Sequence, residues 1–348
     1  MRQEHLSCPV PLEGGVDGPD TAMASLYLAV GTALMAAVAA QFPGAFPPFT
    51  FPAVQPFRPF PFPGGRGGGT GRQLSPSCGR VQSSPAFRFG GPSTTDRPRN
   101  EAFVVGGQPV RDGDWPWMVL LGEQQGGRRV WTCGGTLLSA RTVLTAAHCV
   151  SGRQPAALTA RLGEFDTSRD NDGPHVDAAV ATITVHPGYG GAARHDDIAL
   201  LRLSRPVALG ARVQPACLPP AGADHTGRTA RVAGWGLTEF NGQTAAVLQE
   251  ATLTVSDVNE CEQSYRTQLD FFTRRYPGGF GGTKLCAAGD EKDSCEGDSG
   301  GPLTTAGADG RQQVIGVAST GFGCGLPGFP GIYTKVSQYI SWIMQNAV

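Results

Sequence analysis

Gly-Asp-Ser-Gly-Gly-Pro, at residues 297–302, is the stretch of this chain that says most about its fold. A serine in such a glycine-rich turn can expose its hydroxyl while backbone N–H groups point at one place, which suits a nucleophile beside an oxyanion hole. Alone, a serine flanked by glycines is more often only a turn. Two further strings change this: Thr-Ala-Ala-His-Cys at 145–149 and Asp-Ile-Ala-Leu-Leu at 197–201. Together they supply a base, an acid and a nucleophile in the order His, Asp, Ser.

These three strings resemble the neighbourhoods of the catalytic residues in the chymotrypsin/trypsin family of serine proteases. The similarity runs from about Val104 to the C-terminus. It implies that His148 takes the proton of Ser299 and returns it to the leaving amine, while Asp197 orients the imidazole. The register of Asp-Ile-Ala-Leu selects Asp197 over its neighbour Asp196. The expected chemistry is an acyl-enzyme mechanism.

The resemblance also implies a substrate preference. Asp293 stands six residues before the nucleophile, at the family position on the floor of the primary specificity pocket, and Ser294 lies beside it. Gly321 and Gly331 match the pocket walls, where a side chain would block entry. An open slot over a carboxylate favours a long cation, so we expect cleavage after Arg or Lys.

Activation by cleavage is implied as well. Val-Val-Gly-Gly at 104–107 matches the mature N-terminus of the family, whose freed amine pairs with the aspartate before the nucleophile, here Asp298. That ion pair would order the oxyanion hole, formed by the N–H groups of Gly297 and Ser299, so we expect a zymogen. Phe103 precedes the cut, where the family usually has Arg or Lys. Either an activator that accepts Phe is needed, or the protein stays silent.

Two further departures from the family concern the substrate cleft. Thr320 stands where Trp is usual, and Glu296 where Gln is common. We expect both departures to narrow the range of substrate side chains that the subsites of the cleft accept. With Phe103 they keep open an alternative from a different class, a catalytically silent protease-fold adaptor that binds cascade partners. Adaptors of that kind usually lack the serine or the histidine, and both are present here.

The chain from residue 104 onward has the texture of an all-β protein. Short apolar runs alternate with turn signals, at 117–121, 135–138, 143–146, 198–203 and 314–318, a spacing typical of a barrel or sandwich. Helical spacing is found only at the end, over 333–344. The resemblance implies two six-stranded antiparallel β-barrels, with the site in the cleft between them, and a C-terminal helix.

Nine cysteines, with no C-x-x-C and no H-E-x-x-H pattern, point away from zinc and toward disulfides formed in an oxidising compartment. The resemblance implies four pairs: Cys133–Cys149, Cys261–Cys286, Cys295–Cys324 and Cys78–Cys217. This leaves Cys8 unpaired. After activation cleavage, the pair between Cys78 and Cys217 would keep the prosegment attached as a light chain.

Residues 23–40 are uncharged and apolar and end in Ala-Val-Ala-Ala, the pattern of a secretory signal cut near Ala40. Translation from Met23 would supply the missing amino-terminal charge, make residues 1–22 an upstream extension and remove Cys8. A signal-anchor is the alternative, since about 18 apolar residues can just span a bilayer. We expect cleavage, hence a secreted protein with no membrane attachment after signal removal.

Residues 41–103 are of low complexity, with repeated Phe-Pro steps and a glycine run at 64–71. Proline lacks an N–H donor and glycine costs backbone entropy, so we expect a disordered Pro/Gly-rich propeptide rather than a packed domain. The protease domain would then span 104–348.

Acidic residues crowd one loop, at Glu164, Asp166, Asp170, Asp172 and Asp177. An oxygen-rich loop suits a structural Ca²⁺, which some members of the family bind there, and a solvated acidic loop is the alternative. The expected chemistry requires no cofactor. A net charge of −1 gives no reason to expect nucleic-acid binding.

Three strings, at 161–164, 172–175 and 327–331, resemble those of arthropod clip-type proteases of the proclotting-enzyme kind. Those enzymes act in clotting and melanisation cascades. The resemblance therefore implies a protein substrate in an extracellular immune cascade, an upstream activating protease and a serpin-type inhibitor. Their six-cysteine clip module is not seen here, because only Cys78 precedes the catalytic domain once Cys8 is excluded.

Overall fold

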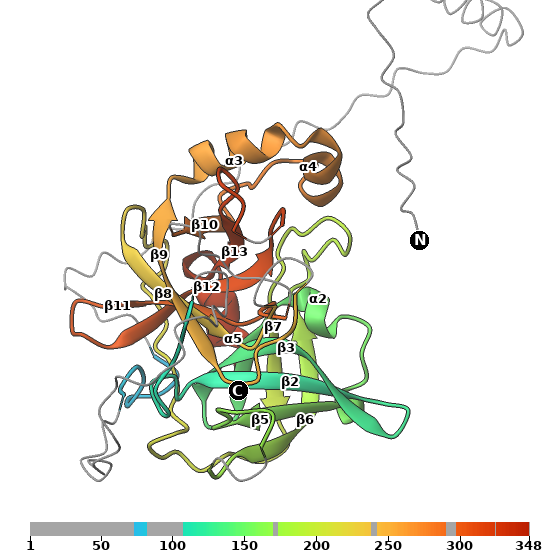
Figure 1. Ribbon diagram of the computed structural model, residues 1–348, viewed down its shortest axis with the longest axis vertical. Coiled ribbons are helices and arrows are strands. Elements are labelled where there is room, and N and C mark those ends of the chain that lie inside the picture. Colours follow the sequence, from blue (N-terminus) through green and yellow to red (C-terminus); the bar gives the residue numbers. More distant parts are fainter. Residues whose placement is uncertain are drawn as a thin grey trace, which may run out of the picture. The chain divides into compact units, whose positions relative to one another are not determined.

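The computed structural model describes residues 73–81, 107–169, 173–237, 242–289, 297–323 and 325–347. The expected upstream extension, the signal segment, most of the propeptide and Cys8 lie outside these residues. Within them the strands form two closed antiparallel barrels, as the resemblance implied. Figure 1 shows the first barrel mainly in green and the second in yellow to red.

The first barrel closes in the order β2-β3-β4-β7-β6-β5. Alternation of buried and half-buried residues along β5 is the period-two pattern of a strand with one face on the core. The longest pairing joins β2 and β3 through a tight turn at Gly126 and Gly127, both in the left-handed region that glycine permits. The strands are β2 Met118–Gln125, β3 Arg128–Ser139, β4 Thr142–Thr145, β5 Leu158–Leu162, β6 Val176–Val185 and β7 Ala199–Leu203.

The second barrel runs β9-β10-β13-β12-β11-β8 and closes where β8 pairs with β9. A two-residue strand, β1 (Gln108–Pro109), extends it by pairing with β9. The strands are β8 Thr229–Gly234, β9 Gln249–Ser256, β10 Lys284–Ala288, β11 Pro302–Ala306, β12 Gln312–Thr320 and β13 Gly331–Lys335. Both barrels therefore have the six strands that the resemblance implied.

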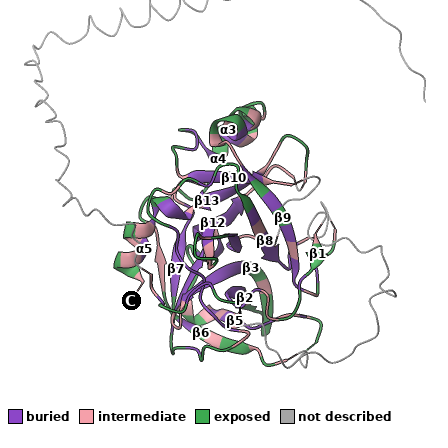
Figure 2. Cartoon of the chain, turned by 90° about the vertical axis from the view of Figure 1, so that its left-hand side faces the viewer, coloured by how far each residue is buried: buried purple, intermediate pink, exposed green. Residues whose placement is uncertain are grey.

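One hydrophobic cluster joins the barrels. It contains Leu121, Leu137 and Leu144 from the first barrel together with Val314 and Val317 from the second. A separate cluster fills the second barrel. Figure 2 shows the strands of both barrels buried over much of their length. Residues contributed by both barrels therefore share one core, and this fixes the two barrels against each other.

Helices occupy the connections and the end of the chain: α2 Ala147–Val150, α3 Val258–Arg266, α4 Leu269–Arg275 and α5 Ile340–Asn346. Short 3₁₀ turns, η2 Pro155–Ala157 and η3 Val336–Gln338, complete them. The sequence prediction of helical structure only at the end is wrong for α3 and α4. Asp257 is the N-cap of helix α3, and its carboxylate accepts hydrogen bonds from the N–H groups of Asn259 and Glu260.

The expected C-terminal helix is present but shorter than its sequence spacing predicted. Helical spacing runs over 333–344, whereas the first three of these residues belong to β13 and the helix itself begins at Ile340. The cause is pairing on both sides, since β13 lies between β10 and β12. Tertiary pairing overrides a local period-3.6 pattern here.

Three of the four implied disulfides are present: Cys78–Cys217, Cys133–Cys149 and Cys261–Cys286. Cys295 and Cys324 lie outside the described residues. No helix in the described ranges is long and apolar enough to cross a membrane.

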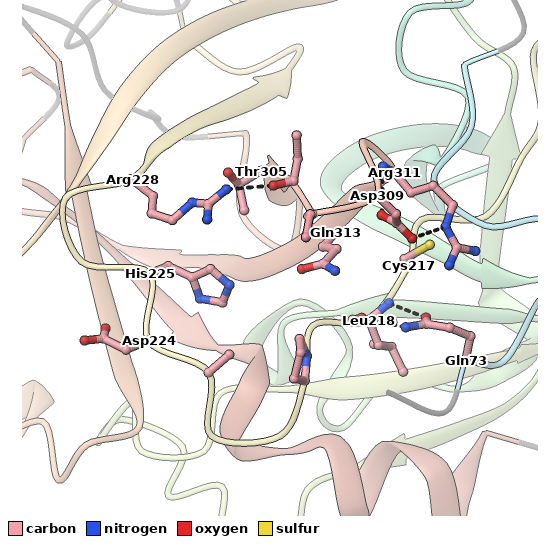
Figure 3. A pocket seen from close by; sticks show the side chains of 15 residues that line it. Gln73, Cys217, Leu218, Asp224, His225, Arg228, Thr305, Asp309, Arg311 and Gln313 are labelled. Atoms are coloured by element: carbon pink, nitrogen blue, oxygen red, sulfur yellow. Dashed lines mark hydrogen bonds and ion pairs between the residues drawn. The ribbon is translucent and has the colours of Figure 1, made fainter. Parts of the chain in front are cut away.

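The segment 73–81 is held on the connection between β7 and β8, and on the start of β12, by more than its disulfide. The side-chain amide of Gln73 donates to the carbonyl of Leu218 at 2.8 Å, and its oxygen accepts from the N–H of Leu218 at 2.7 Å, beside Cys217 (Figure 3). Gly79 extends the attachment, because its N–H donates to the carbonyl of Pro215 and its carbonyl accepts from the N–H of Gln312. Residues 73–81 thus form a short anchor held by a disulfide and by backbone and side-chain hydrogen bonds.

Replacing both Cys78 and Cys217 by Ser removes a crosslink between residues 139 positions apart. We expect the free energy of unfolding to fall by about 2–5 kcal/mol, because the unfolded chain regains the entropy of an open loop. Denaturant unfolding under non-reducing conditions measures this. As a control, Gln73→Ala leaves the crosslink and removes only the two hydrogen bonds to Leu218, so its loss should be smaller. Equal stability of the double variant and the wild type would contradict the anchoring role.

Candidate active site

His148 and Asp197 are joined by two hydrogen bonds. His148 lies in the first turn of α2, directly after β4, and its backbone N–H donates to Asp197 Oδ1 at 2.9 Å. Its ring Nδ1 lies 2.8 Å from Asp197 Oδ2. An ionised carboxylate only accepts hydrogen bonds, so Nδ1 carries the proton and Nε2 of the neutral ring is left as a base. This is the tautomer that proton abstraction from a serine requires.

Asp197 is fully buried at the junction of the barrels. Ser319 of β12 donates its hydroxyl to Asp197 Oδ2 at 2.6 Å, and Thr334 of β13 donates to the Asp197 backbone carbonyl at 2.9 Å. Arg194 Nη1 lies 3.9 Å from Oδ2. The acid of the first barrel is therefore held both by His148 of its own barrel and by two hydroxyls of the second. Sequence reasoning assigned no role to these partners, although the Ser-Thr-Gly string at 319–321 was a signal for one of them.

The electrostatics of Asp197 reflect opposing effects. Burial raises the pKa of its carboxyl, while Lys284, the Ser319 hydrogen bond and Arg194 oppose that rise. The neighbouring Asp196 is in a different environment, since its Oδ1 accepts from the hydroxyl of Tyr339 at 2.6 Å. The two adjacent aspartates thus have different hydrogen-bond partners: Asp197 contacts His148, and Asp196 contacts Tyr339.

Asp196 adopts a φ of 47°, the sole positive φ of a non-glycine residue in the described part of the chain. Such a conformation costs of order 1–3 kcal/mol and persists only where the surroundings enforce it. Here the Tyr339 hydrogen bond and the contact of Ile198 N with the Asp196 carbonyl hold it. The turn delivers Asp197 into the interior.

Ser299 lies in a tight turn pressed against the first barrel. Its carbonyl oxygen accepts from the N–H of Gly134 in β3 at 2.7 Å. The same oxygen lies 3.6 Å from the sulfur of Cys149, the residue that follows His148. Gly300 has a φ of 80°, and a Cβ there would collide with the Thr145 hydroxyl. The turn that carries Ser299 is therefore held against β3 and against the residue that follows His148.

The expected oxyanion-hole and activation residues lie in the same turn. Gly297 has a φ of 99°, and a Cβ there would come within 2.7 Å of the backbone of Gly236, so glycine is required. Asp298 is buried, and its Oδ1 accepts from the N–H of Gly236 at 2.9 Å. Val104 and Phe103 lie outside the described residues.

Of the residues expected to form the specificity pocket, the structure describes only the two wall glycines. Asp293, Ser294 and Glu296 lie outside the described residues. Gly321 follows β12 and Gly331 begins β13, two strands that pair with each other.

Tyr265 of α3 holds the two wall segments together. Its hydroxyl donates to the carbonyl of Pro330 at 2.8 Å and accepts from the N–H of Phe322 at 3.3 Å. The analysis of the sequence missed this residue. The available signal was its position four residues after Cys261, which places both on the buried face of α3.

Carboxylates of the expected calcium loop are paired with arginines where the structure describes them. Glu164 is buried and accepts from Arg161 Nη1 at 3.1 Å. Partial burial raises the pKa of Asp177, but Arg161 and Arg129 outweigh this and hold it below its usual range. Asp166 accepts from the N–H and hydroxyl of Ser168. Asp170 and Asp172 lie outside the described residues.

Potential metal ligands cluster elsewhere only once in the described ranges, at Cys133, His148 and Cys149. The two cysteines of this cluster are bonded to each other, which leaves a single imidazole as donor. This donor set does not fit a structural zinc site, which uses four protein ligands.

Known proteins share the sequence of this domain. The family model "Trypsin" matches residues 104–343. The proclotting enzyme of Tachypleus tridentatus is 37% identical over 255 residues, covering 70% of this chain and 66% of that protein. Phenoloxidase-activating factor 3 of Holotrichia diomphalia is 39% identical over 261 residues, covering 70% and 72%. Serine protease filzig of Drosophila melanogaster is 38% identical over 290 residues, covering 80% and 16%.

This chain therefore spans just under two thirds of the proclotting enzyme and a small part of filzig. The matched region contains both barrels, the His148–Asp197 pair and the turn that carries Ser299. On these grounds the chain belongs to the trypsin family, a family of serine endopeptidases.

Proposed function

We propose that this protein is a secreted, trypsin-like serine endopeptidase, made as a zymogen, that cleaves protein substrates after Arg or Lys. The observation that carries the proposal is the doubly hydrogen-bonded His148–Asp197 pair with Ser299 fixed on the adjacent turn. A merely structural histidine would have no need of a fully buried aspartate whose carboxylate accepts from the Ser319 hydroxyl and whose backbone carbonyl accepts from the Thr334 hydroxyl, both of the other barrel.

The proposed reaction follows from these positions. Ser299 Oγ attacks the carbonyl carbon of the scissile bond while His148 Nε2 takes its proton. The N–H groups of Gly297 and Ser299 stabilise the oxyanion that forms, and each such donor is worth about 3–4 kcal/mol. His148 then gives the proton to the leaving amine. Water repeats the sequence on the acyl-enzyme and restores Ser299. Asp197 stays ionised throughout and stabilises the imidazolium.

Substrate preference in this proposal comes from Asp293 and Ser294 at the pocket floor. Glycine at 321 and at 331 leaves the walls without side chains, which suits the entry of a long cationic residue. Arg would pair with the carboxylate through two parallel hydrogen bonds, whereas Lys would act as a point charge.

Activation in this proposal is cleavage after Phe103, by an upstream protease that accepts Phe. The freed amine of Val104 would pair with Asp298, which is already buried below the catalytic turn. The segment around Cys78 would remain attached as a light chain, because cleavage after Phe103 breaks neither its disulfide to Cys217 nor its hydrogen bonds to Leu218. The disulfides and the secretory pattern of residues 23–40 favour an extracellular location.

Similarity to a proclotting enzyme and to a phenoloxidase-activating factor favours a role in an extracellular cascade of clotting or melanisation. A serpin-type inhibitor belongs to this proposal. A structural Ca²⁺ remains part of it only through Asp170 and Asp172, because the described carboxylates of that loop already have arginine or hydroxyl partners.

The test is an active-site titration of residues 41–348, secreted with its disulfides formed and carrying the recognition sequence of a defined protease before Val104. After cleavage is verified by N-terminal sequencing, diisopropyl fluorophosphate should phosphorylate one serine per molecule. Peptide mapping should place it at Ser299. Hydrolysis of Arg and Lys peptide amides should fall by about 10⁶-fold in Ser299→Ala, because the nucleophile is lost. Absence of labelling after verified cleavage would overturn the proposal and leave the adaptor as the function.

The pocket assignment predicts a change of specificity in Asp293→Ser. Without the floor carboxylate, kcat/KM for Arg and Lys amides should fall by about 30- to 5,000-fold, which corresponds to the 2–5 kcal/mol expected when one partner of a buried charge pair is removed. The labelling rate with diisopropyl fluorophosphate, which needs no cation in the pocket, should stay near that of the wild type. Undiminished cleavage after Arg would show that another residue sets the specificity.

A further inference from the structure

Lys284, the first residue of β10, is a lysine in the interior of the protein. Only 1% of its surface is exposed. Lysine is almost never fully buried without partners, because an ammonium loses its hydration there. Its place beside the catalytic pair therefore needs a physical reason.

The partners of the ammonium lead to the catalytic acid. Lys284 Nζ donates to the hydroxyl of Thr334 at 3.2 Å, in the neighbouring strand β13. The same hydroxyl donates to the backbone carbonyl of Asp197 at 2.9 Å. The carboxylate of Asp197 in turn holds His148. A buried charge thus lies two hydrogen bonds behind the residue that orients the base.

Charged and titratable groups face Lys284 from two parts of the chain. Asp197 and Asp196, in the loop before β7, favour its charge, and Arg194 of the same loop opposes it. The ring of Tyr276, at the end of α4, lies 5.7 Å from Nζ and adds a cation–π contact. Burial raises the pKa of the Tyr276 hydroxyl well above its usual value, so it remains a neutral neighbour.

The balance of these effects leaves the lysine charged at neutral pH and below. Burial lowers the pKa of Lys284 to about 8, and the two aspartates prevent a larger drop. Lys284 is also the strongest of the influences that favour the ionised form of Asp197. The two buried groups therefore stabilise each other's charge.

We propose that Lys284 is a positioning residue of the His148–Asp197 pair: its buried ammonium steadies Asp197 through Thr334 and makes His148 available as a base at a lower pH than Asp197 alone would allow. A positive charge behind the carboxylate disfavours a second positive charge on the imidazole. The kinetic consequence rests on the proposed function, whereas the effect on the imidazole does not.

The experiment is an NMR titration of the His148 ring in the intact chain carrying [¹³C]histidine, with His148→Gln to assign the signal. In Lys284→Met, which keeps the length of the side chain without its charge, the midpoint of the His148 titration should lie about one pH unit higher than in the wild type. Lys284→Arg should keep the wild-type midpoint, since a guanidinium stays charged.

Lys335→Met is the matched control, because it makes the same substitution in the same barrel. The charge of Lys335 acts on Asp224 and His225 rather than on the catalytic pair, so its removal should leave the His148 titration unchanged. Identical midpoints in Lys284→Met and Lys335→Met would overturn the proposal.

A second measurement needs no variant. The His148 signal of the wild type should show a further inflection near pH 8, where Lys284 loses its proton. If Lys284→Met does not fold, the absence of this inflection is the result that overturns the proposal.

The rate of reaction with diisopropyl fluorophosphate distinguishes a failure of this inference from a failure of the proposed function. After cleavage before Val104, Lys284→Met should react with diisopropyl fluorophosphate about tenfold more slowly than the wild type one pH unit below the wild-type midpoint, and nearly as fast well above it. A merely structural role would slow the reaction equally at every pH, and that result would contradict positioning. A wild type that titrates as expected but does not react would overturn the proposed function and leave this inference standing.

Discussion

The contact between the buried carboxylate of Asp197 and the ring of His148 is the interaction on which the rest of the site depends. A carboxylate with no exposed surface is costly unless its oxygens find donors. Asp197 finds them in the His148 backbone and ring and in the Ser319 hydroxyl. These bonds fix the tautomer and orientation of the imidazole in the same step that satisfies the buried charge.

This requirement also explains why the site needs two barrels. The first barrel carries His148 and Asp197. The second supplies the Ser319 hydroxyl to the carboxylate, the Thr334 hydroxyl to the Asp197 backbone carbonyl, and the turn that contains Ser299. Neither barrel could satisfy the buried carboxylate alone. The shared core of Leu137 and Val314 holds the barrels in this relation, so stability and site geometry have a common origin.

Local patterns predicted those parts of the fold and the site whose signal lies in a few adjacent residues. The turn of Ser299 and the short apolar runs of the barrels belong to this class, whereas the disulfide pairs were implied only by the resemblance to the family. The start of the C-terminal helix was predicted too early, because pairing of β13 on both sides outweighs helical spacing at 333–335. The roles of Lys284 and Tyr265 were not predicted either, although the spacing of Tyr265 from Cys261 places it on the buried face of α3. Each acts on a residue about 65 to 87 positions away, a relation that only the closed barrel creates.

Asp197, and not its neighbour Asp196, is the residue that orients His148 in this site. The decisive measurement compares the rate of Ser299 phosphorylation by diisopropyl fluorophosphate in cleaved Asp197→Asn and Asp196→Asn. We predict a loss of about 10⁴-fold in Asp197→Asn, the loss expected when an amide imposes the wrong imidazole tautomer, with the thermal unfolding midpoint nearly unchanged. Asp196→Asn should retain most of the rate. Wild-type reactivity in Asp197→Asn, or the larger loss in Asp196→Asn, would contradict the account.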